Sequence, residues 1–238
     1  MVKKILIFGA TGSIGSSLAH KLHKDKVECH LIARNEEELK KIANELNYTY
    51  SVCDVLKINF VKNLKEDLYD VEIGGVAYCV GSIDIKPLKL TKASDYVSSY
   101  VLNLVSITEI IRTFQDNLEK NKGSIVLFST VAAKKGFPNH SIISSAKAAV
   151  EGLTVALAAE LAPNIRINCI APSLTKSKMA KSVIKNASIE ESIAKMHPLK
   201  RIGTGEDSAN LANFLLTNKS SWITGQIIGV DGGRSNIT

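Results

Sequence analysis

The sequence has few cysteines and no long apolar run. Its 4 cysteines are dispersed along 238 residues and form no C-x-x-C pair, so we expect reduced thiols, no disulfide framework and no metal site. The opening MVKKILIFGA holds only a short apolar run before a glycine-rich turn. No later run approaches the ~18 apolar residues of a membrane span. The sequence therefore predicts a soluble, cytoplasmic protein with no membrane partner.

The sequence also lacks a block of one charge. It has 30 Lys and Arg against 23 Asp and Glu, but the basic residues are scattered among acidic ones, and aromatics make up only 5% of the chain. A nucleic-acid surface usually shows a basic stripe interleaved with aromatic residues. We expect no nucleic-acid partner. The net charge of +7 favours instead a solvated surface that is suited to a phosphate-bearing cofactor or an acidic small-molecule substrate.

The composition that is present favours one globular domain. The chain is 45% hydrophobic, and its mean hydropathy is +0.07, which allows one large buried core. No Pro/Gly/Ser-rich linker, repeat or low-complexity segment divides it. We expect a single domain over residues 1–238.

Short β-forming segments alternate with segments of helical periodicity. Strands are predicted at residues 4–8, 27–33, 48–53, 75–80, 124–129, 165–171 and 226–230. Helical spacing is found between them, for example in residues 93–120 and 143–161. Because these strands are apolar on both faces, they indicate a parallel sheet covered by helices on both sides. The sequence therefore predicts a doubly wound α/β fold with a seven-stranded sheet.

A glycine-rich turn follows the first predicted strand. In FGATGSIGSSLA, Gly9, Gly12 and Gly15 follow the strand and open a helix, where backbone N–H groups and the helix N-terminus can bind a pyrophosphate. A turn needed only for helix–strand packing is the less favoured alternative. The candidate cofactor-binding residues of this turn also include Thr11, Ser13 and Ile14.

The end of the second predicted strand indicates which dinucleotide binds. NAD sites usually place Asp or Glu there for the ribose hydroxyls, but this strand ends with Ala33 and Arg34. A guanidinium can pair with a 2′-phosphate, so NADP is favoured and NAD is the alternative. An Arg34 paired with the glutamates at 36–38 would be the structural alternative. Asp54 could border the adenine pocket or serve an ordinary turn.

Further blocks in the chain resemble the short-chain dehydrogenase/reductase family. They are CDV (53–55), YCVG (78–81), LNL (102–104), NIRINCIAPSL (164–174), HPLKRIGTGEDSANLANFLL (197–216) and WITGQIIGVDGG (222–233). The resemblance covers nearly the whole chain and is greatest to the ketoacyl-reductase-like branch. It implies a Rossmann fold and hydride transfer between a nicotinamide and a carbonyl/alcohol substrate.

The resemblance also carries over the family's catalytic positions. Its asparagine corresponds to Asn103, its serine to Thr130, and its Y-x-x-x-K motif to Ile143 and Lys147. In the family, the tyrosine hydroxyl exchanges the proton of the substrate, and the lysine binds the nicotinamide ribose and lowers the tyrosine pKa. Ile143 can move no proton. The loss of such assistance typically lowers the rate by about 10²–10⁴.

His140 is the candidate replacement for the missing acid. It lies seven residues before Lys147, which is two helical turns on the same face if the helix extends that far. Enoyl reductases of the superfamily place their tyrosine at this spacing. An ordinary loop residue beside Pro138 and Asn139 is the alternative interpretation.

The family resemblance completes the predicted cofactor site. It adds Val55 beside Asp54, Gly81, Pro172 and Ser177, and the last keeps the hydroxyl of the family's threonine. Ser13 stands where the family usually has glycine, so its Cβ would crowd the pyrophosphate while its hydroxyl could bind it. We expect binding to be retained.

Two further segments suggest a lid and an assembly. Residues 173–201 are long and polar with helical pieces, KMAKSVIKN and IEESIAKMH, which is typical of a substrate lid. The helix at 143–161 is apolar around most of its circumference, so it can contact both the sheet and another subunit. Together with the dimers and tetramers that are common in the family it resembles, this predicts a homotetramer or homodimer.

Two functions remain open from the sequence. The first is an NADP-dependent oxidoreductase whose turnover is in doubt because of Ile143. The second is a nucleotide-binding pseudoenzyme with a regulatory or structural role.

Overall fold

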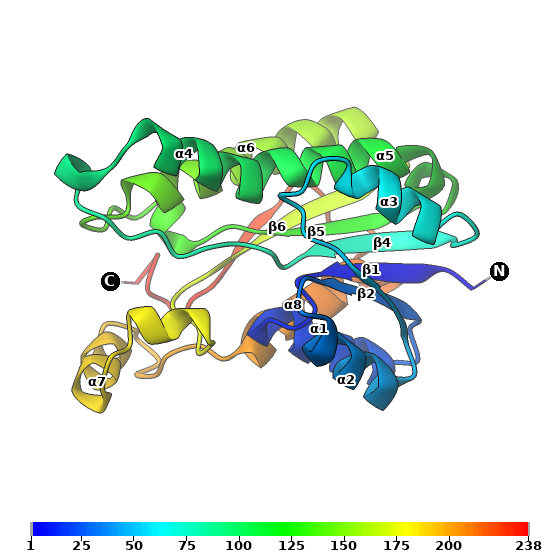
Figure 1. Ribbon diagram of the computed structural model, residues 1–238. Helices are drawn as coiled ribbons and strands as arrows, with labels where there is room; N and C mark the ends of the chain where they lie inside the picture. Colours follow the sequence, from blue (N-terminus) through cyan, green and yellow to red (C-terminus); the bar gives the residue numbers. More distant parts are fainter. Residues whose placement is uncertain (1, 238) are drawn as a thin grey trace.

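A seven-stranded parallel sheet organises the molecule (Figure 1). The computed structural model describes residues 2–237. The strands are β1 (Lys4–Phe8), β2 (Cys29–Ala33), β3 (Thr49–Val52), β4 (Ile73–Tyr78), β5 (Ser124–Phe128), β6 (Arg166–Pro172) and β7 (Ile227–Val230), and their spatial order is β3-β2-β1-β4-β5-β6-β7. The predicted doubly wound Rossmann fold with seven strands is confirmed.

Helices cover both faces of this sheet (Figure 1). One layer contains α1 (Ser13–Lys24), α2 (Glu36–Leu46) and α8 (Gly205–Leu216), and the other contains α3 (Phe60–Asp67), α4 (Ala93–Tyr100), α5 (Ser106–Lys120) and α6 (Ser141–Leu161). Helix α7 (Ala187–Lys195) lies apart, beyond the carboxyl ends of the strands. Short turns of helix are η1 (Leu88–Leu90), η3 (Val131–Ala133), η4 (Met179–Ser182) and η5 (Asn218–Ser220).

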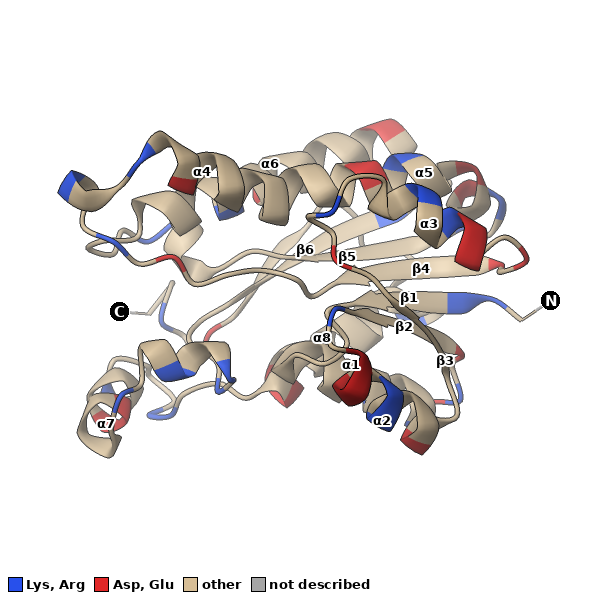
Figure 2. Cartoon of the chain, viewed as in Figure 1, with Lys and Arg blue, Asp and Glu red and all other residues tan. Residues whose placement is uncertain are grey.

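The alternation of side chains along β1 explains why the sheet is buried on both sides. Ile5 and Ile7 belong to the apolar core under α1, α2 and α8, whereas Leu6 and Phe8 belong to the core under α3, α5 and α6. Strand side chains point to opposite faces in turn, so a strand that is apolar throughout supplies both cores. Charged residues, both basic and acidic, are instead spread mainly over the helices and turns (Figure 2).

Some helical expectations need correction. Residues 93–120 do not form one regular helix, because the π-helical segment η2 (Val101–Val105) separates α4 from α5. KMAKSVIKN forms only the short turn η4. The helix α3 has Leu64 as its one buried residue, and so short an element gives too weak a periodicity to be detected in the sequence.

Helix α6 tests the expectation that the chain has no membrane span. By length and composition its 21 residues could cross a membrane. The prediction that no segment is long and apolar enough for a membrane span was therefore wrong. In the fold, however, α6 packs against β5 and β6 and carries the buried Lys147 and Glu151. A core helix that covers a sheet has the same length and hydropathy.

Candidate active site

A cleft lies at the carboxyl ends of the strands, where the strand order reverses between β1 and β4. This is the position at which doubly wound sheets bind their ligands. Its volume is about 520 Å³. Eleven of the predicted site residues line it: Thr11, Gly12, Ser13, Ile14, Gly81, Thr130, His140, Ile143, Lys147, Pro172 and Ser177. The structure therefore brings both the cofactor and the catalytic candidates into one cavity.

The glycine turn between β1 and α1 forms one end of the cleft. Gly9 has a φ of +74°, and a Cβ added to Gly15 would lie 2.3 Å from the Gly9 carbonyl oxygen. Both positions therefore exclude a side chain. Gly12 precedes α1 as its N-cap residue and provides no side-chain cap, so the first N–H groups of the helix can bind an anion. The turn fits a pyrophosphate.

Lys147 lies deep in the cleft and is almost fully buried. Its Nζ donates to the Phe128 carbonyl oxygen at 2.8 Å. Burial lowers the pKa of Lys147 to about 8, because the charged ammonium is poorly solvated there. The Cys79 thiol lies nearby, and burial raises its pKa to about 12. At neutral pH the site therefore combines a cation with an uncharged thiol.

Asn103 lies in the π-helical segment η2, facing the same space. Its Nδ2 donates to the Ser99 carbonyl oxygen at 2.9 Å, while its buried Oδ1 has no hydrogen-bond partner among residues 2–237. A Cβ on Gly81 would lie 3.2 Å from this Oδ1 and 3.3 Å from Lys147 Nζ. A buried unpaired acceptor needs a ligand or water. The three residues thus form a polar recess that fits the hydroxyls of a ribose.

The remaining catalytic candidates lie on β5–α6 and at the start of α6. Thr130 Oγ1 accepts from the Ala132 N–H at 3.3 Å, so its hydroxyl hydrogen can still be donated to a ligand. Ile143 is one turn before Lys147 on α6 and is 5% exposed. His140 is half-buried and precedes the first residue of α6.

Arg34 and Asp54 were predicted to lie at the adenosine end of the cofactor, and the structure treats them differently. Arg34 is exposed and has no ion-pair partner among residues 2–237, because Glu36 pairs with Lys40 and Glu38 with Lys178. The structural alternative for Arg34 is therefore wrong. Asp54 Oδ1 accepts from the Leu56 N–H at 3.1 Å, which is the ordinary turn role.

Some predicted residues do not line the cleft itself. Gly9 and Gly15 belong to the glycine turn but do not line the cleft, and Asn103 lies behind Gly81. Val55 is buried, and its carbonyl oxygen accepts from the Ser106 hydroxyl at 3.1 Å. Ser177 does line the cleft, and its Oγ also accepts from the Ala180 N–H at 3.0 Å.

The cleft contains residues that the sequence did not reveal. Arg234, near the C-terminus, lines the cleft with its guanidinium 4.7 Å from the centre of the Phe137 ring. Arg234 Nη1 also donates to the Ser173 hydroxyl at 3.4 Å. Glu38 and Lys178 form an ion pair that joins α2 to the segment 173–201. No local sequence signal marks such contacts, because their partners are far apart in the chain.

Comparison with known proteins gives consistent matches along the chain. The family model described as Enoyl-(Acyl carrier protein) reductase matches residues 9–235. A tropinone reductase homologue of Arabidopsis thaliana is 33% identical over 240 residues, 97% of this chain and 74% of that protein. The 3-oxoacyl-(acyl-carrier-protein) reductase FabG of Rickettsia prowazekii is 32% identical over 97% of this chain and 96% of its own.

Solved structures agree with these sequence matches. A short-chain type dehydrogenase/reductase from Mycobacterium ulcerans has a TM-score of 0.90 at 26% identity, covering 98% of this chain and 90% of that chain. The structure of ElxO with NADP bound has a TM-score of 0.87 at 27% identity, covering 98% of this chain and 99% of that chain.

Proposed function

The chain belongs to the short-chain dehydrogenase/reductase family, and from that premise we propose that it is an NADP-dependent oxidoreductase acting on a carbonyl/alcohol pair. One observation carries this proposal. Lys147 and Gly81 line the cleft that also contains the glycine turn, and the unpaired Oδ1 of Asn103 lies directly behind Gly81. Lys147 Nζ donates one hydrogen to the Phe128 carbonyl oxygen, so its other hydrogens can be donated to a ligand. A dinucleotide supplies a ribose for this group and a pyrophosphate for the glycine turn.

The residues that would hold the dinucleotide lie in the cleft and next to it. The glycine turn and the α1 N-terminus would bind the pyrophosphate, and Lys147 with Asn103 the nicotinamide ribose. Arg34, which is exposed directly after β2 and does not line the cleft, would bind the 2′-phosphate. The bound nicotinamide supplies a hydride. The neighbouring ElxO structure contains NADP, which supports the choice of NADP over NAD.

The chain's own side chains would orient the substrate. Thr130 keeps its hydroxyl hydrogen for the substrate oxygen, since its lone pair already accepts from Ala132 N–H. The segment at 173–201 contributes Met179, Val183 and Ile193 to the cleft. These apolar side chains would exclude water and contact an apolar part of a small-molecule substrate.

A second candidate function rests on Ile143. Its side chain is 5% exposed and can neither give nor take a proton, whereas an oxidoreductase of this family uses a tyrosine at the corresponding position. A protein that binds the nucleotide without turnover, and acts as a regulatory or structural partner, would tolerate this residue. For either function, we also propose that the protein is cytoplasmic.

Equilibrium binding of the two dinucleotides tests whether the protein binds a dinucleotide and prefers NADP to NAD. Fluorescence titration with NADPH and with NADH should give a lower dissociation constant for NADPH. Binding of NADH alone would contradict the choice of cofactor, and binding of neither would contradict both candidate functions.

A further inference from the structure

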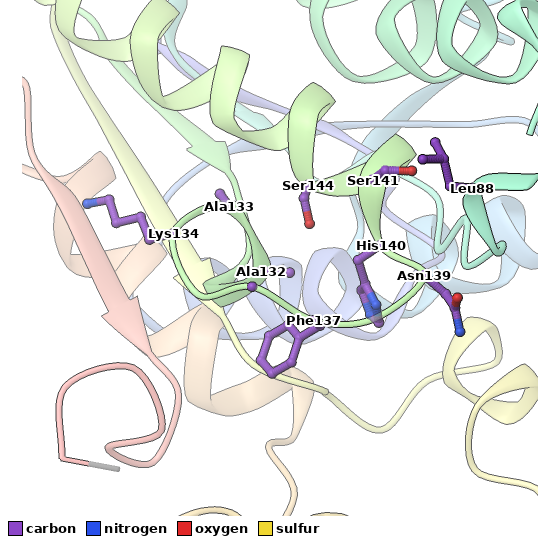
Figure 3. A pocket seen from close by; sticks show the side chains of 10 residues that line it. Leu88, Ala132, Ala133, Lys134, Phe137, Asn139, His140, Ser141 and Ser144 are labelled. Carbon is purple, nitrogen blue, oxygen red and sulfur yellow. The ribbon is translucent and has the colours of Figure 1, made fainter.

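One histidine stands in the wall between two cavities. Beside the main cleft lies a second cavity of about 380 Å³ at the start of α6, lined among others by Leu88, Ser141 and Ser144 (Figure 3). His140, Phe137 and Ala132 line both cavities. His140 therefore faces the cleft that contains Lys147 and Ile143, and it also borders a separate space that can hold water.

The loop before α6 holds the imidazole in a defined place. Asn139 adopts a left-handed conformation with a φ of 67°, and its carbonyl oxygen accepts from the Lys86 N–H at 2.8 Å. The imidazole centre of His140 lies 5.4 Å from that of Phe137 (Figure 3). Phe137 in turn contacts the guanidinium of Arg234 on its ring. Backbone and aromatic contacts thus fix the ring on two sides.

The hydrogen bond of His140 assigns roles to its two nitrogens. Nδ1 lies 2.7 Å from the Pro138 carbonyl oxygen. A carbonyl oxygen only accepts, so Nδ1 carries a hydrogen and donates it. No other described group bonds Nε2 of His140. Nε2 is therefore the nitrogen at which a proton can be taken up and released.

From this geometry, and resting on the function proposed above, we propose that His140 is the proton donor of the reaction, acting through Nε2. In carbonyl reduction, the carbon receives the hydride and its two electrons from a reduced nicotinamide, and the C=O π bond breaks. The oxygen takes the proton from Nε2 of the imidazolium, which leaves an alcohol, an oxidised nicotinamide and a neutral imidazole. Water in the second cavity returns the proton to Nε2.

The other groups in the cleft are poorer donors. Ile143 has no proton to give, and hydroxyls such as that of Thr130 are weak acids near neutral pH. The ammonium of Lys147 donates to the Phe128 carbonyl oxygen and lies beside Asn103 and Gly81, so it serves the recess that fits the ribose. His140 is the one histidine among the residues that line the cleft.

His140→Asn tests the donor with little disturbance of the helix. Asparagine is a preferred residue at the position that precedes a helix, so α6 should keep its start. We expect the single-turnover rate of NADPH oxidation, measured against a panel of a β-keto ester, a cyclic ketone and an aldehyde, to fall about 10²-fold. The affinity for NADPH should stay within about twofold. The matched control is His23→Asn on α1, which should change neither quantity.

Two further measurements test the same role of His140. In the His140→Asn background, Ile143→Tyr places a phenol one turn before Lys147 and should restore the rate at least about tenfold. Independently of turnover, NMR of the ¹⁵N-histidine-labelled chain should show neutral His140 protonated at Nδ1. The Nε2 resonance should shift when NADP⁺ and the alcohol product of the panel are added together.

The outcomes separate this inference from the proposed function. An unchanged rate in His140→Asn, or a neutral His140 protonated at Nε2 rather than Nδ1, would overturn the role of His140. So would an unaltered chain that reduces nothing while Ile143→Tyr reduces carbonyls, but the cofactor site would then stand. Failure of every variant to bind NADPH would instead overturn the proposed function.

Discussion

At the scale of the residue, Lys147 links the electrostatics of the cleft to its chemistry. Its ammonium is buried between Asn103, Gly81 and the Phe128 carbonyl, and the lowered pKa expresses the free energy that this burial costs. A ligand that offers hydroxyl groups would offset part of that cost. The burial of this ammonium also makes the stability of the fold depend on pH.

Lys147→Met should remove a pH dependence of stability. The pKa of Lys147 is about 8 in the folded chain against an ordinary value of 10.5, so the unfolded chain binds more protons between these values. The free energy of unfolding should therefore rise as pH increases from about 8 to about 10.5. Below about pH 8, Lys147 should contribute no pH dependence, because it is protonated in both the folded and the unfolded chain. At neutral pH, Lys147→Met should raise the free energy of unfolding by a few kcal/mol. The full shift of the Lys147 pKa corresponds to about 3 kcal/mol.

Urea denaturation across this pH range measures the effect. The exposed Lys41→Met on α2 is the control and should leave the slope unchanged. A constant difference between Lys147→Met and the unaltered chain at every pH would contradict the account.

Arg34→Ala should separate the two dinucleotides. Hydrogen bonds to a charged group contribute roughly 1.5–3 kcal/mol, so the dissociation constant of NADPH should rise at least about tenfold while that of NADH changes little. Calorimetric titration with both dinucleotides measures this, and Arg112→Ala on α5 is the control. An equal loss of both affinities would show that Arg34 does not bind the 2′-phosphate.

At the scale of the element, the glycine turn depends on a helix remote in sequence. A Cβ added to Gly205, the first residue of α8, would lie 2.2 Å from the Ser13 carbonyl oxygen. Asp207 closes the capping box of α8, and its ion pair with Arg201 holds the pKa of that carboxyl well below its usual range. The start of α8 is therefore fixed against the turn that fits the pyrophosphate.

Gly205→Ala should disturb both stability and cofactor binding. The added methyl group meets backbone rather than a flexible side chain, so α8 or the turn must move. We expect a lower midpoint of thermal unfolding and a weaker affinity for NADPH, measured by calorimetry and fluorescence titration. Asn210→Ala, at an exposed position of α8, should lower neither. If Gly205→Ala binds NADPH as the unaltered chain does, the turn does not depend on α8.

The elements also show what the sequence could and could not predict. Gly9, Gly12 and Gly15 form a local pattern, so the turn and its strand and helix followed from the sequence. Lys147 and Asn103 were found through the family resemblance. The π-helical turn at Asn103 was not predicted, since such turns are rare single insertions in a helix. The contact of Phe137 with Arg234 arises only when the chain folds.

At the scale of the whole molecule, an apolar surface remains on the layer of α4, η2 and α6. Val97, Val105 and Val155 are exposed there, with Val155 at 51%. This agrees with the apolar character of α6 along most of its circumference, but nothing in the single chain tests assembly. A homotetramer or homodimer with twofold interfaces stays a prediction.

Val155→Glu should weaken that assembly. A buried unpaired carboxylate is unfavourable at a subunit interface, so sedimentation analysis should find a homotetramer or homodimer for the unaltered chain and smaller species for the variant. Ile58→Glu, at an exposed apolar residue between β3 and α3, should leave the mass unchanged. A monomeric unaltered chain would contradict the prediction.

The most direct test of the whole account is a single-turnover experiment on the unaltered chain. The protein is mixed with stoichiometric NADPH and then with each carbonyl compound of the panel, and the loss of NADPH is followed together with the alcohol formed. The account predicts that at least one compound is reduced in an amount equal to the NADPH oxidised, although residue 143 is isoleucine. NADPH that binds and stays reduced with every compound, while Ile143→Tyr oxidises it, would contradict the account and favour the nucleotide-binding pseudoenzyme.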